Sequence, residues 1–345
     1  MSGPGGPASV MSAEMAEQPE RLARLLDRWD DTVAAVRALA EPGLAGSVIV
    51  ARGSSDHAGA YGRYLLELVS GRPAGMAAPS LHTLYGARID YTGFLAVAVS
   101  QSGRTPEILT TLERMQAAGA AGLAITNDGD SPLGRAARVT LGLEAGPERA
   151  VPATKTVTAT MLAFALVAAA LGPAPFTREQ AAELPGWVRA VLDDPAPAEA
   201  LAAHLTDATR LIVVGRGLMF SAALETALKL METTRIPAEG FSAADLRHGP
   251  IAVIEPGYPV LALHADGPAR ADMRELVDDL RGRGADVAVM ADEAGAALPL
   301  PSGMPEALAP IVAVVRAQQL ALALSRRRGL DPDAPEGLSK VTATQ

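Results

Sequence analysis

An internal repeat is the feature of this sequence that most constrains its fold. The segment 48–53 (VIVARG) matches the segment 212–217 (IVVGRG) at an offset of 164 positions. The apolar run 94–99 matches the run 258–263 at the same offset. Further matches at this offset are Gly103 with Gly267, 123–125 with 287–289, and Asp128 with Asp292. Several matches at one offset indicate two copies of a single structural unit.

Each copy alternates short apolar runs with polar or Gly-containing turns and longer helical segments. Continuous apolar strands joined by helices are typical of a parallel sheet that helices cover on both faces. We therefore predict an α/β fold of two tandem modules, each a three-layer α/β/α sandwich. The expected divisions are a helical arm over 1–29, a first module over 30–172, a Pro-containing linker over 173–194, a second module over 195–325 and a tail over 326–345.

Composition excludes several classes of protein. With 345 residues, 49% of them apolar and 20% charged, the chain can bury two cores. It has no cysteine, which excludes disulfides, thiolate metal sites and a cysteine nucleophile. The formal net charge of -9 argues against nucleic acid as the main partner, because nucleic-acid binding depends on basic surfaces.

The sequence gives no sign of membrane targeting. The first ten residues, MSGPGGPASV, carry neither a basic region nor a long apolar run, so we expect no signal peptide. Whether they are a native leader or a remnant of expression stays open, since Met11 is a second possible start. The most apolar run, 157–171, has only 15 residues, too few to span a bilayer. We expect a buried helix there, and a cytoplasmic protein.

Two turns of the first module follow predicted strand ends, where open parallel sheets bind their ligands. They are Gly53-Ser54-Ser55 and the segment 100–106, SQSGRTP. Thr105 is placed to cap a helix, Pro106 suits its first position, and Gly103 permits a tight turn. Hydroxyls and an amide around a helix N-terminus would bind a phosphate. The alternative is a plain turn without a ligand.

The repeat favours the phosphate hypothesis for the first module only. At the matching place the second module reads His-Ala-Asp-Gly-Pro over 264–268. The glycine is kept, but the hydroxyl groups are replaced and Asp266 would repel an anion. The segment 148–155, ERAVPATK, precedes the apolar helix, and Thr154 is placed to cap it. Lys155 could support the anion site or be a solvated surface lysine.

The second module contains three candidate catalytic side chains. Lys229 and Glu232 are three positions apart on a predicted helix over 221–234, so they share a face. They could form an ordinary surface ion pair, but the mostly apolar remainder of the helix favours a cleft. His248 lies in a Gly-Pro turn and could transfer protons near neutral pH or simply be a hydrogen-bonded loop residue.

Five motifs in order carry a resemblance to a known family. They are SQSGRTPE at 100–107, ATK at 153–155, ALKLMET at 227–233, RHGP at 247–250 and LSKVT at 338–342. Together they resemble the double-SIS (sugar isomerase) proteins, from about Met11 to the end of the chain. The pattern is closest to freestanding SIS-type glucosamine-6-phosphate deaminases and to the isomerase half of glucosamine-6-phosphate synthase. Two tandem SIS modules are therefore expected.

The resemblance implies a role for particular residues. The implied phosphate ligands are Ser55, Ser100, Gln101, Ser102 and Thr105, with possible further contacts from Gly53, Ser54, Val151 and Ala153. Glu232 would move a proton between C1 and C2 of the sugar, beside Lys229. His248 would open the sugar ring of the neighbouring subunit, which implies a homodimer. Lys340 would come from a tail that closes over the sugar.

The expected reaction converts glucosamine 6-phosphate and water to fructose 6-phosphate and ammonia, without metal or cofactor. Synthesis from glutamine is not expected, because an amidotransferase domain needs a cysteine. Arg104, where the synthase has an acidic residue, and the tail sequence Lys-Val-Thr both favour the deaminases. Phe220 replaces the third glycine of a dinucleotide fingerprint. Alternatives are the same chemistry or deglycation on galactosamine 6-phosphate or fructosamine 6-phosphate, or a non-enzymatic phosphosugar sensor.

Overall fold

A computed structural model describes residues 9–40 and 43–340. The chain divides into two compact units, which we describe separately. The first-sheet unit contains residues 21–40, 43–146 and 156–182. The second-sheet unit contains residues 9–20, 147–155 and 183–340. The chain therefore crosses between the units several times, and the segment 147–155 packs with the second sheet rather than with its neighbours in sequence.

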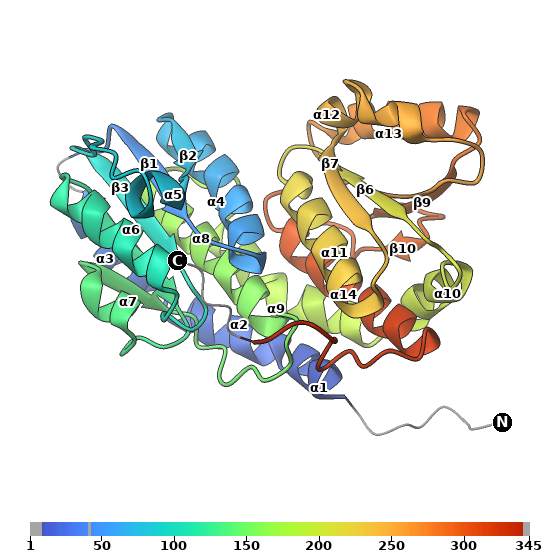
Figure 1. The fold of residues 1–345 in the computed structure, drawn as a ribbon, viewed down its shortest axis with the longest axis horizontal. Helices are drawn as coiled ribbons and strands as arrows, with labels where there is room; N and C mark the ends of the chain where they lie inside the picture. The colour runs from blue at the N-terminus through green and yellow to red at the C-terminus, as the bar shows by residue number, and fades with distance from the viewer. Residues whose placement is uncertain (1–8, 41–42, 341–345) are drawn as a thin grey trace. The chain divides into compact units, whose positions relative to one another are not determined.

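The first-sheet unit is built on five parallel strands in the order β2-β1-β3-β4-β5. Figure 1 labels β1, β2 and β3 of this sheet. They are β1 (Gly46–Val50), β2 (Ala74–Met76), β3 (Phe94–Val99), β4 (Ala121–Thr126) and β5 (Val139–Gly142). The chain leaves β1 toward β2 on one side and returns to β3 on the other. The strand order therefore reverses between β1 and β3, and the carboxyl ends of the strands at such a point are the usual ligand site of these sheets.

Helices cover both faces of the first sheet. They are α3 (Trp29–Ala40), α4 (Ser54–Ser70), α5 (Pro79–Thr83), α6 (Pro106–Ala117), α7 (Pro132–Ala136) and α8 (Lys155–Leu171). Ile108 and Leu112 of α6 pack against Val50 and Ala98 on one face. Helices α4 and α8 approach closely at Gly62, where a Cβ atom would lie 2.3 Å from the Phe164 ring. The predicted three-layer sandwich is confirmed.

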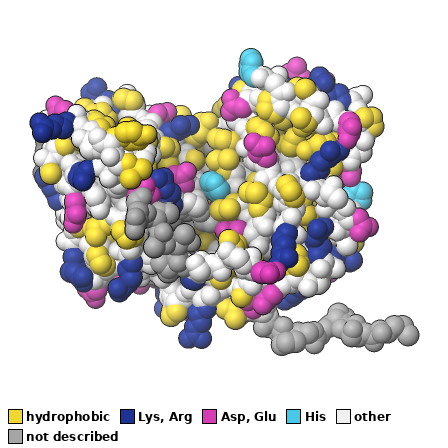
Figure 2. Space-filling view, viewed as in Figure 1, with side chains coloured by type: hydrophobic (Ala, Val, Ile, Leu, Met, Phe, Trp, Pro, Cys, Tyr) yellow, Lys and Arg dark blue, Asp and Glu magenta, His cyan; other side chains and the backbone are white. Residues whose placement is uncertain are grey.

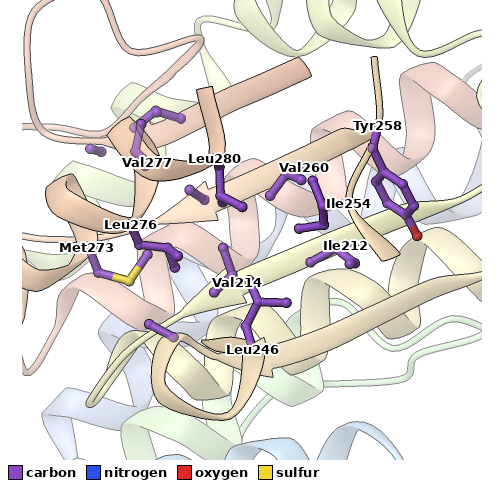
Figure 3. Close-up of a cluster of buried hydrophobic side chains, with 14 residues drawn as sticks. Ile212, Val214, Leu246, Ile254, Tyr258, Val260, Met273, Leu276, Val277 and Leu280 are labelled. Atoms are coloured by element: carbon purple, nitrogen blue, oxygen red, sulfur yellow. The ribbon is translucent and has the colours of Figure 1, made fainter. Parts of the chain in front are cut away.

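The second-sheet unit repeats this design with strands in the order β10-β9-β8-β6-β7. They are β6 (Leu211–Gly215), β7 (Ala238–Ser242), β8 (Pro259–Leu263), β9 (Asp286–Ala291) and β10 (Leu298–Pro299). Its helices are α1 (Val10–Ala16), α10 (Ala196–His204), α11 (Met219–Thr234), α12 (Ala243–Arg247), the 3-10 helix η1 (Pro250–Val253), α13 (Arg270–Gly282) and α14 (Ala309–Arg327). Met273, Leu276 and Leu280 of α13 pack on Val214 and Val260 of the sheet (Figure 3).

The repeat seen in the sequence is also a repeat of strand register. Val48 of β1 lies opposite Ala96 of β3, and Ile212 of β6 lies opposite Val260 of β8. Both pairs are related by the offset of 164 positions. Equivalent residues of the two sheets therefore occupy equivalent places, which allows the two ligand-binding edges to be compared residue by residue.

Some helices differ slightly from the prediction. Helix α11 begins two residues before the predicted start at Ser221. Helix α2 (Gln18–Asp27) and helix α9 (Arg178–Leu192) contain the boundaries between the units, and α9 continues through Pro185. The apolar run 157–171 is a buried helix, as predicted. In the described ranges, none of the helices combines the length and the apolar character needed to cross a membrane.

The surface carries charges of both signs. On the face that Figure 2 draws, the described Lys and Arg side chains are interspersed with Asp and Glu. Nucleic-acid-binding proteins instead gather their basic side chains into a patch or stripe. The described part of this face therefore presents no continuous basic surface.

Candidate functional site

The predicted phosphate turns lie at the carboxyl ends of β1 and β3. Gly53 precedes α4 with a φ of 59°, a conformation that favours glycine. The Ser100 and Thr105 hydroxyls lie 3.1 Å apart, and the Gly103 N–H donates to the Ser100 carbonyl at 3.0 Å. The two hydroxyl-bearing turns thus occupy the place where this sheet type binds ligands.

Gly103 is required by its surroundings. Its φ is 61°, and a Cβ atom would lie 1.9 Å from the Ser131 Oγ atom. Both the backbone conformation and the close approach exclude larger residues. Since Gly103 is the centre of the turn 100–105, it fixes the path along which the Ser100, Gln101 and Ser102 groups are presented.

Thr105 occupies the cap position of α6, but its side chain makes no hydrogen bond to the helix. The predicted capping contact is therefore wrong, because the Thr105 hydroxyl is placed beside Ser100 instead. The N-terminus of α6 therefore has no cap from the Thr105 side chain. A helix N-terminus in this state attracts an anion.

The arginines near these turns already have acidic partners. Arg52 forms two contacts of 3.0 Å with the buried Glu107 carboxylate. Arg104, the residue that departs from the synthase pattern, pairs with Asp128 at 3.2 Å. An anion at these turns would therefore be bound mainly by hydroxyl and backbone N–H groups.

The second-sheet unit contains a buried cluster of charged side chains on α11. The Lys229 side chain is fully buried, and its ammonium group bonds to the Glu232 carboxylate and lies 3.5 Å from Glu225. Burial by itself lowers the pKa of Lys229, but the carboxylates of Glu225 and Glu232 outweigh it, so the pKa is raised. Lys229 is therefore a permanent cation. The surface-pair alternative is wrong for Lys229, while Glu232 keeps a 21% exposed side chain.

Helix geometry explains this cluster. Glu225, Lys229 and Glu232 are spaced by four and three residues, so they lie on one side of α11. Leu230 and Ala227 are buried on the same helix, which packs against β6 and β7. Glu225 was not predicted as a site residue. Its position four residues before Lys229 was the signal that could have identified it.

A second buried carboxylate binds the tail. The Glu148 side chain is fully buried, and its Oε2 atom accepts from the Lys340 ammonium group at 2.8 Å. Its Oε1 atom accepts from the backbone N–H of Thr154 at 2.9 Å and from its hydroxyl at 3.3 Å. The Glu148 charge also contributes to the raised pKa of Lys229, after the larger effects of burial, Glu225 and Glu232. Glu148 therefore links Lys340 electrostatically to Lys229.

The tail is fixed some residues before Lys340. The Asp333 carboxylate accepts from the backbone N–H groups of Val10 and Met11, at 2.8 and 2.7 Å, and so caps α1. The Asp333 carbonyl accepts from the Val151 N–H at 2.8 Å. Val341 and Thr342 of the LSKVT motif lie outside the described residues. The described tail thus reaches Lys340 from a fixed point at Asp333.

The segment 148–155 is tied to the second-sheet unit. Lys155 is 1% exposed and pairs with Glu17 at 3.0 Å, so the hypothesis of a solvated lysine is wrong. Because Val151 donates its N–H to Asp333, only its carbonyl and side chain remain for the predicted ligand contact. Ala153 is half-buried, and its predicted contact stays a prediction.

His248 lies at the end of α12 with an exposed side chain. Its ring makes no hydrogen bond to another described residue, which disfavours the hypothesis of a hydrogen-bonded loop histidine. The preceding Arg247 is fixed by Asp272, which accepts from its guanidinium group at 2.9 and 3.1 Å. The local backbone is thus fixed while the imidazole faces outward.

Known proteins share this sequence pattern. The pattern of the SIS domain matches residues 47–170 and 204–326, which are the two halves of the repeat. The chain belongs to the SIS domain family. The SIS modules of this chain place their hydroxyl turns on the first sheet and their buried Lys–Glu cluster on the second-sheet unit. In the described ranges, no group of three or more His, Asp or Glu side chains is arranged to hold a metal ion.

Two relatives are similar over almost the whole SIS chain. A glutamine–fructose-6-phosphate aminotransferase (isomerizing) of Methanothermobacter thermautotrophicus is 34% identical over 354 residues, covering 100% of this chain and 59% of the relative. The chain thus spans about three-fifths of that protein. A solved structure named as a candidate phosphosugar isomerase from Silicibacter pomeroyi DSS-3 is 34% identical with a TM-score of 0.85, covering 94% of this chain and 100% of that one.

A second solved structure shares the fold. It is a glucosamine-6-phosphate deaminase from Thermotoga maritima, with a TM-score of 0.80 and 22% identity, covering 97% of this SIS chain and 100% of that one. At this sequence identity the comparison supports the fold alone. The sequence prediction of two tandem SIS modules is confirmed.

Proposed function

We propose that this chain isomerises and deaminates glucosamine 6-phosphate, releasing fructose 6-phosphate and ammonia. The observation that carries the proposal is the buried Lys229 ammonium group bonded to the partly exposed Glu232 carboxylate. An aldose–ketose shift needs one base that moves a proton between neighbouring carbons and one cation that stabilises the intermediate. These two groups are adjacent on α11, and the hydroxyl turns supply a phosphate ligand set.

The phosphate would be bound first. The proposed phosphate ligands are Ser55, Ser100, Gln101, Ser102 and Thr105, at the carboxyl ends of β1 and β3. The resemblance implies possible further contacts from Gly53, Ser54, Val151 and Ala153. The N-terminus of α6, which Thr105 does not cap with its side chain, would supply positive potential. Such binding orients the sugar without contributing to the chemical step.

The closed sugar ring would then open. This step needs a group that can give and take a proton, and the imidazole of His248 is a side chain of that type. Its exposed position at the end of α12 supports transfer into the site of a second copy. We therefore also propose a homodimer in which each chain supplies His248 to its neighbour.

Glu232 would next remove the proton from C2 and return it to C1. The C1 oxygen gains a proton and the C2 nitrogen loses one, so the aldehyde amine becomes a hydroxy imine of the same composition. Addition of water to C2 then releases ammonia and leaves the ketone of fructose 6-phosphate. All atoms balance without a metal or a redox cofactor.

Lys229 would act as a cation rather than as a nucleophile. A lysine that forms an imine with a carbonyl must lose its proton, which requires a lowered pKa. The pKa of Lys229 is raised by the neighbouring carboxylates, despite the opposing effect of burial. Lys229 would therefore stabilise the negative charge that develops on oxygen during the proton shift. Lys340, held by Glu148, would add a second cation from the tail.

The deciding experiment measures ammonia and fructose 6-phosphate released from glucosamine 6-phosphate at neutral pH without glutamine. Equal amounts of both products support the proposal. Turnover of galactosamine 6-phosphate or fructosamine 6-phosphate alone would instead assign the same site to another sugar phosphate. Binding of all three, with no turnover of any, would contradict the catalytic role and favour a sensor.

A further inference from the structure

The carboxyl edge of the second sheet carries charged side chains that the proposed reaction does not use. We call this region the second edge, and define it by the turns that begin at Arg216 after β6, His264 after β8 and Asp292 after β9. At the offset of 164 positions, His264 corresponds to Ser100 of the phosphate turn. Parallel sheets bind ligands at this edge, so the second edge occupies a ligand-binding position with different chemistry.

Three buried polar atoms at the second edge have no hydrogen-bond partner within the described ranges. They are His264 Nδ1, Arg270 Nε and Asp292 Oδ1. His264 is only 2% exposed, and the charges of Glu293, Arg270 and Asp292 all act on its ring. Buried polar atoms are nearly always paired, and each unpaired one costs about 1–3 kcal/mol. Three such atoms at one sheet edge therefore point to a bound polar molecule.

The arginines of the second edge are not available to a phosphate. Arg270 pairs with Asp266 at 2.8 Å. Arg274 pairs with Glu293 at 2.6 Å. Arg216 pairs with Asp272 at 3.1 Å. Since these guanidinium groups are already neutralised by carboxylates, the second edge offers no uncompensated positive charge to a dianion.

A carboxyl group also fills the turn that corresponds to Gly103. The Glu306 carboxylate lies against Gly267, where a Cβ atom would be 2.4 Å from the Glu306 Oε2 atom. Burial and the neighbouring Asp266 charge raise the pKa of Glu306. This environment already disfavours one more negative charge, so a phosphate would be repelled from the place that attracts it in the first module.

We propose that the second edge binds an uncharged polyhydroxy compound, such as an unphosphorylated monosaccharide or sugar alcohol. Each hydroxyl group both donates and accepts a hydrogen bond. Hydroxyl groups can therefore donate to Asp292 Oδ1, accept from Arg270 Nε and pair with His264 Nδ1. This site is separate from the phosphosugar turns and does not depend on the proposed reaction.

Binding of glucose, N-acetylglucosamine and mannitol to the full chain, measured by saturation-transfer NMR and calorimetry, tests the proposal. At least one of them should bind the wild-type protein, and Asp292→Asn and Arg270→Lys should each weaken that binding by about tenfold or more, the effect of losing one charged hydrogen bond. The matched control is Ser102→Ala in the phosphate turn, which should bind the same compound as the wild-type protein does.

Three results would overturn the proposal. The first is that the folded wild-type protein binds none of the three compounds. The second is that binding survives unchanged in both Asp292→Asn and Arg270→Lys. The third is that Ser102→Ala abolishes binding, which would place the sugar in the phosphosugar turns. Glucosamine 6-phosphate turnover is not a readout here, so failure of this proposal and failure of the proposed reaction are distinguishable.

Discussion

The Lys340 ammonium group lies 2.8 Å from the Glu148 carboxylate, although 192 positions separate the two residues in sequence. Glu148 is fully buried and fixed by Thr154, whereas Lys340 stands at the end of the described tail. The buried residue is therefore the fixed partner, and the position of the tail lysine depends on it.

Replacing Glu148 with Gln should lower turnover by weakening the hold on Lys340. The amide still accepts from Thr154 but no longer attracts an ammonium group, and a charged hydrogen bond of about 1.5–3 kcal/mol is lost. If Lys340 acts in the chemical step, kcat should fall by about tenfold to a hundredfold, with little change in KM. Steady-state kinetics with glucosamine 6-phosphate measures both constants.

The control for this variant is Thr154→Val, which removes the hydroxyl contact at 3.3 Å and keeps the backbone N–H. It should leave kcat close to that of the wild-type protein. A double-mutant cycle of Glu148→Gln with Lys340→Met should be strongly non-additive. Additive effects of the two substitutions would show that Glu148 does not act through Lys340.

Glu232→Gln should abolish the proton shift while the protein stays folded. General acid–base catalysis contributes about a hundredfold to ten-thousandfold, so kcat should fall within that range. Exchange of the C2 proton of glucosamine 6-phosphate with deuterated solvent should stop, as followed by NMR. The exposed Glu239→Gln on β7 is the matched control. Exchange at the wild-type rate in Glu232→Gln would reject Glu232 as the base.

Lys229→Met should reduce both stability and activity, and the two losses can be separated. The substitution leaves the Glu225 carboxylate buried without its ammonium partner, and breaking a buried pair in this way costs about 3–5 kcal/mol. The double variant Lys229→Met with Glu225→Leu should recover most of the unfolding free energy in urea denaturation, yet remain inactive. Recovery of activity in the double variant would contradict the role of the Lys229 charge.

Gly103→Ala should destabilise the turn 100–105 by more than the positive φ of Gly103 alone would explain. Gly103 and Gly86 have nearly the same φ, 61° and 60°, but a Cβ atom at Gly86 meets nothing within 4 Å. Gly86→Ala should therefore cost only about 1–2 kcal/mol, the penalty of the left-handed conformation. Gly103→Ala should cost clearly more in thermal denaturation and weaken binding of inorganic phosphate. Equal melting temperatures for the two variants would refute the proposed contact with Ser131.

Glu306→Gln should make the stability of the folded protein less dependent on pH. Burial and Asp266 raise the pKa of Glu306 in the folded state, so the folded protein keeps a proton that the unfolded chain releases. The protonated Glu306 side chain therefore stabilises the fold fully below the ordinary glutamate pKa. This stabilisation is lost as the pH rises through the pKa of Glu306 in the folded state. At pH 7 the variant should therefore melt at a higher temperature than the wild-type protein. A lower melting temperature for Glu306→Gln than for the wild-type protein at pH 7 would contradict this prediction.

Sequence reasoning was most successful where the information is local or periodic. The offset between Val48 and Ile212 was visible as a match of apolar runs, and the same offset governs the register of both sheets. The spacing of Lys229 and Glu232 determined their shared helix face. In each case, a short-range rule of strand or helix geometry was enough to predict the outcome.

Contacts that depend on packing between distant segments were not predictable in this way. Glu148 contacts Lys340 only because the segment 147–155 leaves its sequence neighbours and joins the other unit. The burial of Lys155 beside Glu17 has the same origin. Neither spacing nor composition shows which loop joins which unit. The sequence therefore left open whether Lys155 is solvated, and in the structure it is buried.

The fixing of Asp333 to the start of α1 limits how far the tail can move. Seven residues lead from Asp333 to Lys340, and an extended segment of that length reaches at most about 25 Å. If the tail closes over the sugar as the resemblance implies, opening the site would move only this short segment and would break the Arg235–Glu336 ion pair. Movements of such segments take nanoseconds to microseconds, so we expect the exit of sugar and ammonia to be fast compared with an ordinary enzymatic turnover.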